Sequence, residues 1–444
     1  MPGGCCALRL TLQNEWKIAL IIGMFRAFCR WRAWLCLGLL IFALPGCKGQ
    51  PALSFDHIQG PSLPVPASYF GMHVHRLLNG TPWPSVGFTT LRLWDTGTTW
   101  KDLEPSRGQF RFDKLDGLVE LAAKQHVSLI LTFGKTPDWA SSVEPGSTSA
   151  RETGPPTSLD DWATFVRTVA TRYRGRIAGY EIWNEPNAHN FYNGTVREMV
   201  EMTRVASAVI HQADPDALVL SPAPEGANGV PWLRAFFILG GAQYVDVMAY
   251  HFYVSPDPPE QILALAAQVR TALDAAHVDK PFWNTETGWG PPHVFATDGE
   301  QAAYVARALL LAWVSGAGRF YWYSWDNRNW ATLSLTRGDA YAPTPAATAF
   351  DAIRRWMSGR RVDECVRDHA GTWSCRLTAP GEESFIYWNP DHSAPFAPHG
   401  ALRVTPKLFT LDHPFDPAGG AIPLATPSPQ RILFRDASVH GRAP

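Results

Sequence analysis

The pattern that most restricts the fold of this chain is a repeated alternation of short apolar runs with longer helical patterns. Helical spacing of apolar residues recurs at 116–126, 159–173, 196–213, 259–276, 299–314 and 344–357. Eight short apolar runs have the length and composition of strands: 68–75, 88–94, 127–133, 177–183, 217–221, 245–252, 281–286 and 319–325. Strands that alternate with helices form parallel βαβ units. Eight units predict an α/β fold, a (β/α)8 TIM barrel over residues 67–358.

An open, doubly wound sheet is the rival architecture, and it would carry a Gly-rich phosphate-binding turn after its first strand. The sequence Gly-Met-His-Val-His at 71–75 is not such a turn. The 46% of hydrophobic residues suffices for a large core, and a net charge of -1 provides no field that would recruit nucleic acid. We therefore expect a closed barrel with no nucleic-acid partner and no obligate protein partner.

The pattern of the sequence changes from helical to strand-like after residue 359. Helical patterns stop, and short strand-like runs follow at 361–367, 373–378, 384–388, 401–409 and 431–434, separated by Pro, Gly and Asp. Short strands with turn residues between them are typical of small β-sandwiches. We predict a small all-β, sandwich-like domain at 359–444, packed on the barrel.

The N-terminal segment has the pattern of an export signal. Three arginines between residues 26 and 32 precede an apolar run at 33–44, which is too short to span a bilayer. A Leu-Pro-Gly-Cys sequence ending at Cys47 then resembles a bacterial lipobox, in which the cysteine is lipidated. We predict a signal peptide at 1–47, starting at Met1 or Met24, a Pro/Ser/Gly-rich linker at 48–66, and a membrane-anchored lipoprotein in the periplasm or at the cell surface. Ordinary cleavage and secretion is the alternative.

The remaining cysteines suggest a disulfide. Of seven cysteines, four lie before Cys47 in the predicted signal peptide, so Cys365 and Cys375 are left in the mature chain. A pair in an exported protein is a candidate for a bridge. The segment 368–371 between them reads as a hairpin turn.

Two glutamates follow predicted strands in a way that suggests catalysis. The fourth strand ends in Trp-Asn-Glu-Pro at 183–186, and the seventh ends in Asn-Thr-Glu at 284–286. In barrels of this kind catalytic groups lie at the carboxyl ends of the strands. Retaining glycoside hydrolysis requires two such carboxyl groups, one that protonates the leaving oxygen and one that attacks the anomeric carbon. A lone glutamate would more often be a salt-bridge partner or a helix cap, but Glu185 and Glu286 stand at matching strand ends.

These motifs resemble glycoside hydrolase clan A. The Asn-Glu-Pro step on strand four, with a glutamate on strand seven, is most similar to family 39, which includes β-xylosidases and bacterial exopolysaccharide hydrolases, and next to family 5. The resemblance extends from about residue 69 to 357. It implies a retaining glycosidase acting on a poly- or oligosaccharide without a cofactor, with Glu185 as acid/base and Glu286 as nucleophile.

The resemblance also implies roles for residues on strands two and four. Arg92, in Leu-Arg-Leu-Trp, matches an arginine that would hold Glu286 ionised and lower its pKa. Asn184 matches the asparagine that binds the sugar 2-hydroxyl. Glu181, on the same strand, should point into the barrel as the buried partner of a basic or hydroxyl group.

On strand six, His251 and Tyr253 match a pair whose tyrosine hydroxyl hydrogen-bonds the nucleophile. On strand eight the resemblance implies a tryptophan floor beneath the reacting sugar. Trp325 fits this position, and Trp322 competes for it. The resemblance therefore predicts substrate contacts from these two strands.

Other tryptophans are candidates for stacking on sugar rings. The chain has 19 of them, and Trp139 and Trp289 lie in predicted loops on the catalytic face, the first in the Gly/Pro/Ser-rich segment 134–158. Packing beneath the loops is the equal alternative for both.

His73 and His75, two residues apart on strand one, present one alternative chemistry. Metal-dependent amidohydrolases carry such a pair, but they also need a strand-four lysine and further histidines. Here only His251 and Asp326 could join the pair. We therefore predict no metal site, and we expect the two histidines to bind sugar hydroxyls or to lie in the core.

Two other functions remain open at this point. A transglycosylase would use the same residues with a sugar acceptor in place of water. A non-catalytic carbohydrate-binding lipoprotein would have no use for two opposed carboxylates.

Overall fold

The barrel is present as predicted. The computed structural model of the protein describes residues 57–326, 329–396, 407–409, 414–415 and 425–435. Eight parallel strands pair in the order β6-β5-β4-β3-β2-β9-β8-β7, and a bridge between Leu220 and Val247 joins the two ends of this series. The strands are β2 (Phe70–Met72), β3 (Thr90–Leu93), β4 (Ser128–Thr132), β5 (Gly179–Glu181), β6 (Leu218–Leu220), β7 (Met248–His251), β8 (Phe282–Thr287) and β9 (Phe320–Trp322). Each lies inside or overlaps one of the eight predicted runs, which confirms the (β/α)8 architecture.

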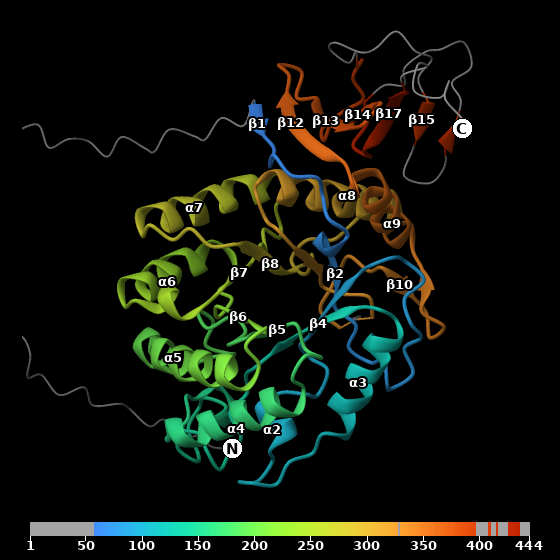
Figure 1. The fold of residues 1–444 in the computed structure, drawn as a ribbon. Coiled ribbons are helices and arrows are strands. Elements are labelled where there is room, and N and C mark those ends of the chain that lie inside the picture. The colour runs from blue at the N-terminus through green and yellow to red at the C-terminus, as the bar shows by residue number, and fades with distance from the viewer. Residues whose placement is uncertain (1–56, 327–328, 397–406, 410–413, 416–424, 436–444) are drawn as a thin grey trace, which may run out of the picture. The chain divides into compact units, whose positions relative to one another are not determined.

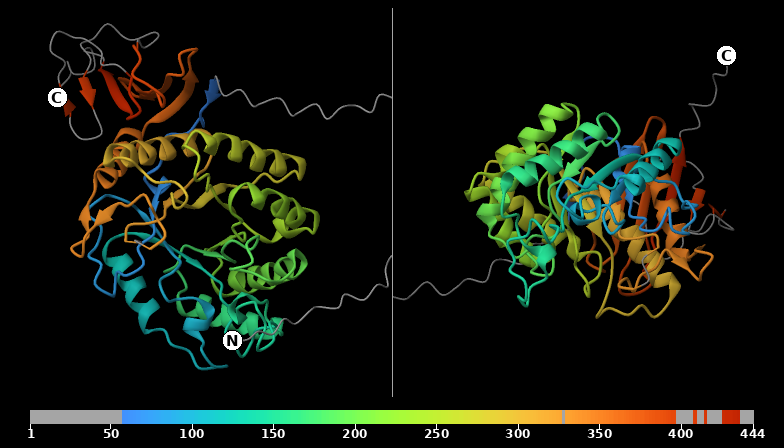
Figure 2. Two further views of the ribbon diagram at one scale, coloured as in Figure 1. Left: turned by 180° about the vertical axis from the view of Figure 1, so that it is seen from behind. Right: turned by 90° about the horizontal axis from the view of Figure 1, so that it is seen from below.

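Helices form a ring outside the strands, seen along the barrel in Figure 1 and from two further directions in Figure 2. They are α2 (Trp100–Leu103), α3 (Asp113–Lys124), α4 (Leu159–Arg172), α5 (Val196–Ala213), α6 (Gly226–Ile238), α7 (Gln261–Ala275), α8 (Asp298–Val314) and α9 (Pro345–Met357), with short 3-10 turns η1 (Ala67–Tyr69), η2 (Arg151–Thr153) and η3 (Gly241–Tyr244). Side chains cap several helix starts. At α5, Thr195 and Glu198 form a capping box, which satisfies backbone N–H groups that have no partner inside the helix.

Helix α6 lies where the sequence shows no helical pattern. Gly226 and Gly229 lie in its first turns, and Pro231 is inside it. Glycine and proline are the weakest helix formers, so local propensity argues against a helix here. The helix forms because its buried side, including Leu233 and Phe236, packs against the barrel.

A second, antiparallel sheet consists of six strands that follow the barrel in sequence and one, β1, that precedes it, which confirms the predicted all-β segment. Its order is β1-β12-β13-β14-β17-β15-β16. The strands are β1 (His57–Gln59), β12 (Arg361–Arg367), β13 (Trp373–Ala379), β14 (Glu382–Trp388), β15 (Lys407–Phe409), β16 (Pro414–Phe415) and β17 (Gln430–Arg435). A separate hairpin, β10 (Thr336–Arg337) with β11 (Ala342–Pro343), belongs to the segment between β9 and α9.

The linker predicted at 48–66 differs from the structure in its second half. Strand β1 pairs with β12, with Ile58 opposite Cys365, and Val65 is buried and forms a bridge with Ser358. An edge strand is held by backbone hydrogen bonds, which carry little sequence signature. The Pro/Ser/Gly composition therefore pointed to a tether where the chain is part of the folded unit.

The described β strands of this C-terminal region form a single sheet. One face of this sheet packs on the barrel. Val362, Trp373 and Trp388 are part of the same continuous hydrophobic core as the barrel residues. The Trp388 indole N–H donates to the carboxylate of Glu260, just before α7, at 2.9 Å. The sheet is therefore packed on the barrel, as the sequence analysis expected.

The structure joins Cys365 and Cys375 in a disulfide between directly paired positions of β12 and β13. The Asp368 carboxylate closes the turn between these strands by accepting from the N–H groups of Ala370 and Thr372. The predicted signal peptide and Cys47 lie outside the described residues. Within the described ranges, no helix combines the length and the apolar character that crossing a membrane would need.

Candidate active site

The interior of the barrel is filled by apolar side chains, except at the carboxyl ends of the strands, where charged side chains lie. A separate buried cluster fills the interior: Ile130, Leu220, Ala223, Val247, Ala249, Trp283 and Tyr321. Side chains two residues apart on a strand face the same way. Arg92 and Glu181 therefore also point into the barrel, near the ends of β3 and β5, and both are fully buried. The apolar layers thus support a charged layer at the catalytic end of the barrel.

Arg92 is shared by two carboxylates. Its Nη1 donates to Glu286 Oε2 at 2.5 Å, and its Nε donates to Glu181 Oε1 at 3.0 Å. Glu181 also accepts from the Thr132 hydroxyl at 3.1 Å. Arg92 Nη2 donates to Asn184 Oδ1 at 2.9 Å. Glu181 thus has the basic and hydroxyl partners that were expected for it, and it fixes the guanidinium that contacts Glu286.

Glu185 is held in an uncommon backbone conformation. Its φ of 44° lies in the left-handed region, which non-glycine residues seldom adopt outside turns and functional sites. Its N–H donates to the Ala223 carbonyl at 2.9 Å, and its carbonyl accepts from the Ala188 N–H at 3.0 Å. Its carboxyl group lies 2.9 Å from Nδ1 of His251. These contacts on both sides position the carboxyl group over the mouth of the barrel.

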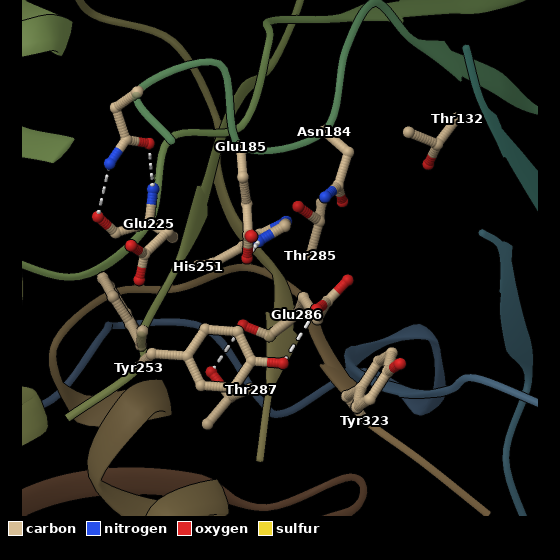
Figure 3. Close-up of polar contacts among 12 residues, drawn as sticks. Thr132, Asn184, Glu185, Glu225, His251, Tyr253, Thr285, Glu286, Thr287 and Tyr323 are labelled. Atoms are coloured by element: carbon tan, nitrogen blue, oxygen red, sulfur yellow. Dashed lines mark hydrogen bonds and ion pairs between the residues drawn. The ribbon is translucent and has the colours of Figure 1, made fainter. Parts of the chain in front are cut away.

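The two glutamates lie close together (Figure 3). Carboxylate oxygens of Glu185 and Glu286 and a ring nitrogen of His251 all lie within 4.8 Å of one another. The Tyr253 hydroxyl donates to Glu286 Oε1 at 2.7 Å, so Glu286 receives Arg92 on one oxygen and Tyr253 on the other. Both carboxyl groups are largely buried, and Glu185 has no cation among its hydrogen-bond partners.

The pKa of Glu286 is raised to about 7, and burial is the largest cause. The charge of Arg92 and the hydrogen bond from Tyr253 act in the opposite direction. Arg92 and Tyr253 therefore act on this pKa in the predicted direction, but the loss of solvation outweighs both contacts. Arg92 and Tyr253 still lower the pKa relative to a carboxyl group that is merely buried.

The pKa of Glu185 is raised well above its usual value, first by burial and next by the negative charge of Glu286. Burial also lowers the pKa of His251 well below 6.5, so the ring beside Glu185 is neutral. Arg92 hydrogen-bonds Glu286 directly, whereas its charge acts on Glu185 only from a distance. As the pair loses its first proton, the charge is better stabilised on Glu286, which leaves the proton on Glu185.

Three other polar side chains lie around this pair: Asn184, His73 and His75. They differ in whether they have a hydrogen-bonding group free for a substrate. Asn184 is fully buried, and its amide nitrogen has no partner among the described residues. His73 is fully buried, with Nε2 3.0 Å from the Thr285 carbonyl. His75 lies 3.6 Å from Asp326. Asn184 therefore has a free donor, whereas the two histidines are at least partly engaged in the protein.

A metal could be held only by the catalytic cluster itself. Glu185, His251 and Glu286 are the one group of three metal-ligating side chains that lie this close together in the described part of the chain. His73 and His75 do not belong to it; their ring centroids are 6.3 Å apart and the rings are nearly perpendicular. The amidohydrolase arrangement considered from the sequence is not formed.

A second aromatic residue near Glu286, besides Tyr253, is Tyr323, which was not predicted from the sequence. Trp325 and Trp322, the two candidates for the floor, are both buried in the main hydrophobic core, and Trp322 stacks on Trp289. Tyr321 points into the barrel, and Tyr323, two residues on, is seen near Glu286 in Figure 3. The period of two along a strand was the signal that could have found it.

Trp330, at the mouth, was also missed. Its exposed fraction is 40%, and its ring lies edge-on to Tyr253 at 5.3 Å and to Tyr323 at 5.8 Å. A side chain at Gly290 would collide with this indole. The lack of a side chain at Gly290 therefore allows the Trp330 indole to approach the site. The sequence alone does not reveal that this position must be glycine.

The two loop tryptophans pack rather than face the site. Trp139 donates its indole N–H to the Glu104 carbonyl at 2.9 Å and meets Trp100 edge-on. Trp289 is fully buried and donates to the Asp257 carbonyl at 3.0 Å. Of the two alternatives left open by the sequence, the structure favours packing beneath the loops for both.

Comparison with known sequences decides the family. The sequence model described as "Glycosyl hydrolases family 39" matches residues 83–314, more than half of the chain. The chain belongs to glycoside hydrolase family 39. Among curated relatives of this family 39 protein, a "Beta-xylosidase" from Caldicellulosiruptor saccharolyticus is 23% identical over 292 residues, which cover 58% of this chain and 59% of the relative. The chain matches less than two thirds of the relative's length.

Solved structures show the same fold around this family 39 site. A family 39 glycoside hydrolase from Bacteroides cellulosilyticus WH2 is similar with a TM-score of 0.67 at 18% identity, covering 83% of this chain and 81% of that one. A monomeric β-xylosidase from Caulobacter crescentus CB15 is similar with a TM-score of 0.61 at 14% identity, covering 86% and 98%. At these identities the likeness concerns the fold alone.

Proposed function

We propose that this family 39 protein hydrolyses glycosides with retention, by two displacements at one anomeric carbon. In the first, Glu286 Oε2 or Oε1 attacks this carbon, its bond to the leaving oxygen breaks, and that oxygen takes the proton of Glu185. In the second, Glu185 takes a proton from water, the water oxygen bonds to the anomeric carbon, and Glu286 is released. After the first step Glu185 is ionised and Glu286 is bonded to the sugar. After the second step Glu185 is protonated and Glu286 is ionised again.

The close approach of the two carboxyl groups is the observation that carries this proposal. Retaining enzymes hold them about 5–5.5 Å apart, whereas inverting enzymes need about 6.5–9.5 Å to admit a water. Oxygens of Glu185 and Glu286 within 4.8 Å of each other fit the first case. The anomeric configuration of the first sugar released tests the mechanism, because double displacement retains it and single displacement inverts it.

Further support comes from the groups around the pair. Burial and the negative charge of Glu286 raise the pKa of Glu185, which suits a proton donor, whereas Arg92 and Tyr253 contact Glu286 and favour its ionised form. The unpartnered amide N–H of Asn184 faces no protein acceptor and is available to a sugar hydroxyl. Tyr323 and Trp330 offer aromatic surface where the sugar would lie.

We propose β-linked xylosides as the first substrates to examine. The curated relatives include proteins named "Beta-xylosidase" and "Endo-1,4-beta-xylanase 2", the latter from Claviceps purpurea and 31% identical over 125 residues. The substrate of this chain is a separate question from its family, because loops at the barrel mouth define the sugar subsites.

We also propose that the protein is exported and anchored by a lipid on Cys47, from the apolar run and the Leu-Pro-Gly-Cys sequence that precede the fold. In a bacterial host, Cys47→Ser should move the protein from the membrane fraction to the soluble fraction, because the acyl chains are lost. Fractionation followed by immunoblotting measures this. A wild-type protein that is already soluble would contradict the anchor.

A further inference from the structure

Glu225 is a carboxylate near the catalytic pair that no part of the proposed mechanism uses. It lies between β6 and α6 and forms a backbone bridge with His251. Its position just before α6 would suit a helix cap, but its side chain makes no capping hydrogen bond. Within the described ranges its carboxylate also has no ion pair or other hydrogen-bond partner. The ordinary structural reasons for a glutamate at a helix start are therefore missing.

The backbone of Glu225 is nonetheless fixed firmly. The Asn187 side chain accepts from its N–H at 2.9 Å and donates to its carbonyl at 3.2 Å. Asn187 follows Glu185 by two residues, so the segment that carries Glu185 also positions Glu225. Because its backbone is fixed, the half-buried carboxylate of Glu225 projects from a defined point, with its oxygens free to accept hydrogen bonds from a ligand.

The side of the catalytic pair on which Glu225 lies indicates which part of a substrate it would meet. In Figure 3, Asn184 lies on one side of Glu185 and Glu225 on the other. The sugar that is attacked must lie over Glu286, within reach of Asn184. The group that leaves with the proton of Glu185 therefore extends away from Asn184, toward Glu225.

A cavity of about 350 Å³ opens at this place. Glu225 and Tyr253 line it together with side chains from the start of α6, the segment after β7, and α7. Among these are Asn228, Ser255, Gln261 and Gln268. Amides and hydroxyls can both donate and accept hydrogen bonds, which matches the hydroxyl groups of a sugar.

We propose that Glu225 and this cavity form the subsite for the leaving group, and that it takes a sugar unit whose hydroxyl groups donate to the Glu225 carboxylate. This inference rests on the proposed function, because it is Glu185 as proton donor that defines the leaving side. Charge-assisted hydrogen bonds of this kind are stronger than neutral ones. The subsite would favour oligosaccharides over glycosides with a leaving group that lacks hydroxyls.

Kinetics with two substrates that share one glycone test the subsite. We compare xylobiose, whose leaving group is a sugar, with 4-nitrophenyl β-xyloside, whose leaving group has no hydroxyl to donate. Glu225→Ala should lower kcat/KM for xylobiose about 10- to 100-fold more than for the aryl xyloside, because only the disaccharide loses a hydrogen bond to a charged group. Glu225→Gln, which keeps an acceptor, should lie between. Glu201→Ala removes an exposed glutamate of α5 that pairs with Arg204, and it serves as the control.

The pH profile gives a second readout. The charge of Glu225 contributes to raising the pKa of Glu185. Removing that charge in Glu225→Gln should shift the basic limb of kcat/KM for the aryl xyloside to lower pH, because Glu185 then loses its proton earlier. If the wild type is active and Glu225→Ala lowers kcat/KM equally on both substrates, or on neither, the subsite proposal is overturned. A wild type that is inactive on both substrates would overturn the proposed xylosidase function and the subsite with it.

Discussion

Replacing Glu286 with alanine should lower kcat by about 10⁴- to 10⁶-fold on every substrate, including those with good leaving groups. Without this carboxylate no covalent intermediate can form, and the alanine side chain leaves nothing to attack the anomeric carbon. Steady-state and long-incubation assays of purified protein with an aryl glycoside measure the loss. Activity within 10-fold of the wild type would show that another group is the nucleophile.

The fold should tolerate this change. Arg92 keeps its partner Glu181, so the variant does not leave the guanidinium alone in the barrel. Thermal unfolding of Glu286→Ala should therefore remain cooperative. Glu201→Ala, at the surface, should keep wild-type turnover and serves as the matched control for removal of a glutamate.

Replacing Glu185 with alanine should produce a loss that depends on the leaving group. For poor leaving groups, which need a proton, kcat/KM should fall by about 10²- to 10⁴-fold. For a 2,4-dinitrophenyl leaving group the first step should be nearly unaffected, and the intermediate should accumulate because no base activates water. Rates measured across a series of aryl glycosides of graded leaving-group pKa give this dependence.

Added azide distinguishes this role from mere disruption of the site. Azide needs no general base, so it should restore turnover of the Glu185→Ala variant and give a glycosyl azide with the configuration of the substrate. The Glu286→Ala variant should give no product of that configuration. A loss in Glu185→Ala that is the same for all leaving groups and is not relieved by azide would contradict the acid/base assignment.

The sequence predicted the barrel well because its strands and helices depend on local patterns. Short apolar strands and amphipathic helices appear in the sequence with periods of two and about 3.6 residues. Glu185 and Glu286 were predicted from the strand ends, Glu181 from its place on the strand, and Arg92 from the resemblance to clan A. Helix α6 escaped because its glycines and proline conceal the pattern, and packing overrides propensity there.

Features that depend on tertiary contacts could not be predicted. Strand β1 joins a sheet whose other strands lie some 300 residues away, as the pairing of Ile58 with Cys365 shows. Trp325 enters the core although it shares the period-two spacing with Tyr321 and Tyr323, because the chain leaves the strand after Trp322. The pKa of Glu286 depends on how deeply the barrel buries it, which outweighs the arginine that the sequence revealed.

In the proposed mechanism, Glu185 and Glu286 carry out two successive displacements at the anomeric carbon. Proton NMR of the reaction of wild-type protein with a β-xyloside, recorded within the first minutes before mutarotation, measures it most directly. We predict that the first-formed sugar is the β-anomer, which then equilibrates slowly with the α-anomer. Initial formation of the α-anomer would show a single displacement by water and would contradict the mechanism.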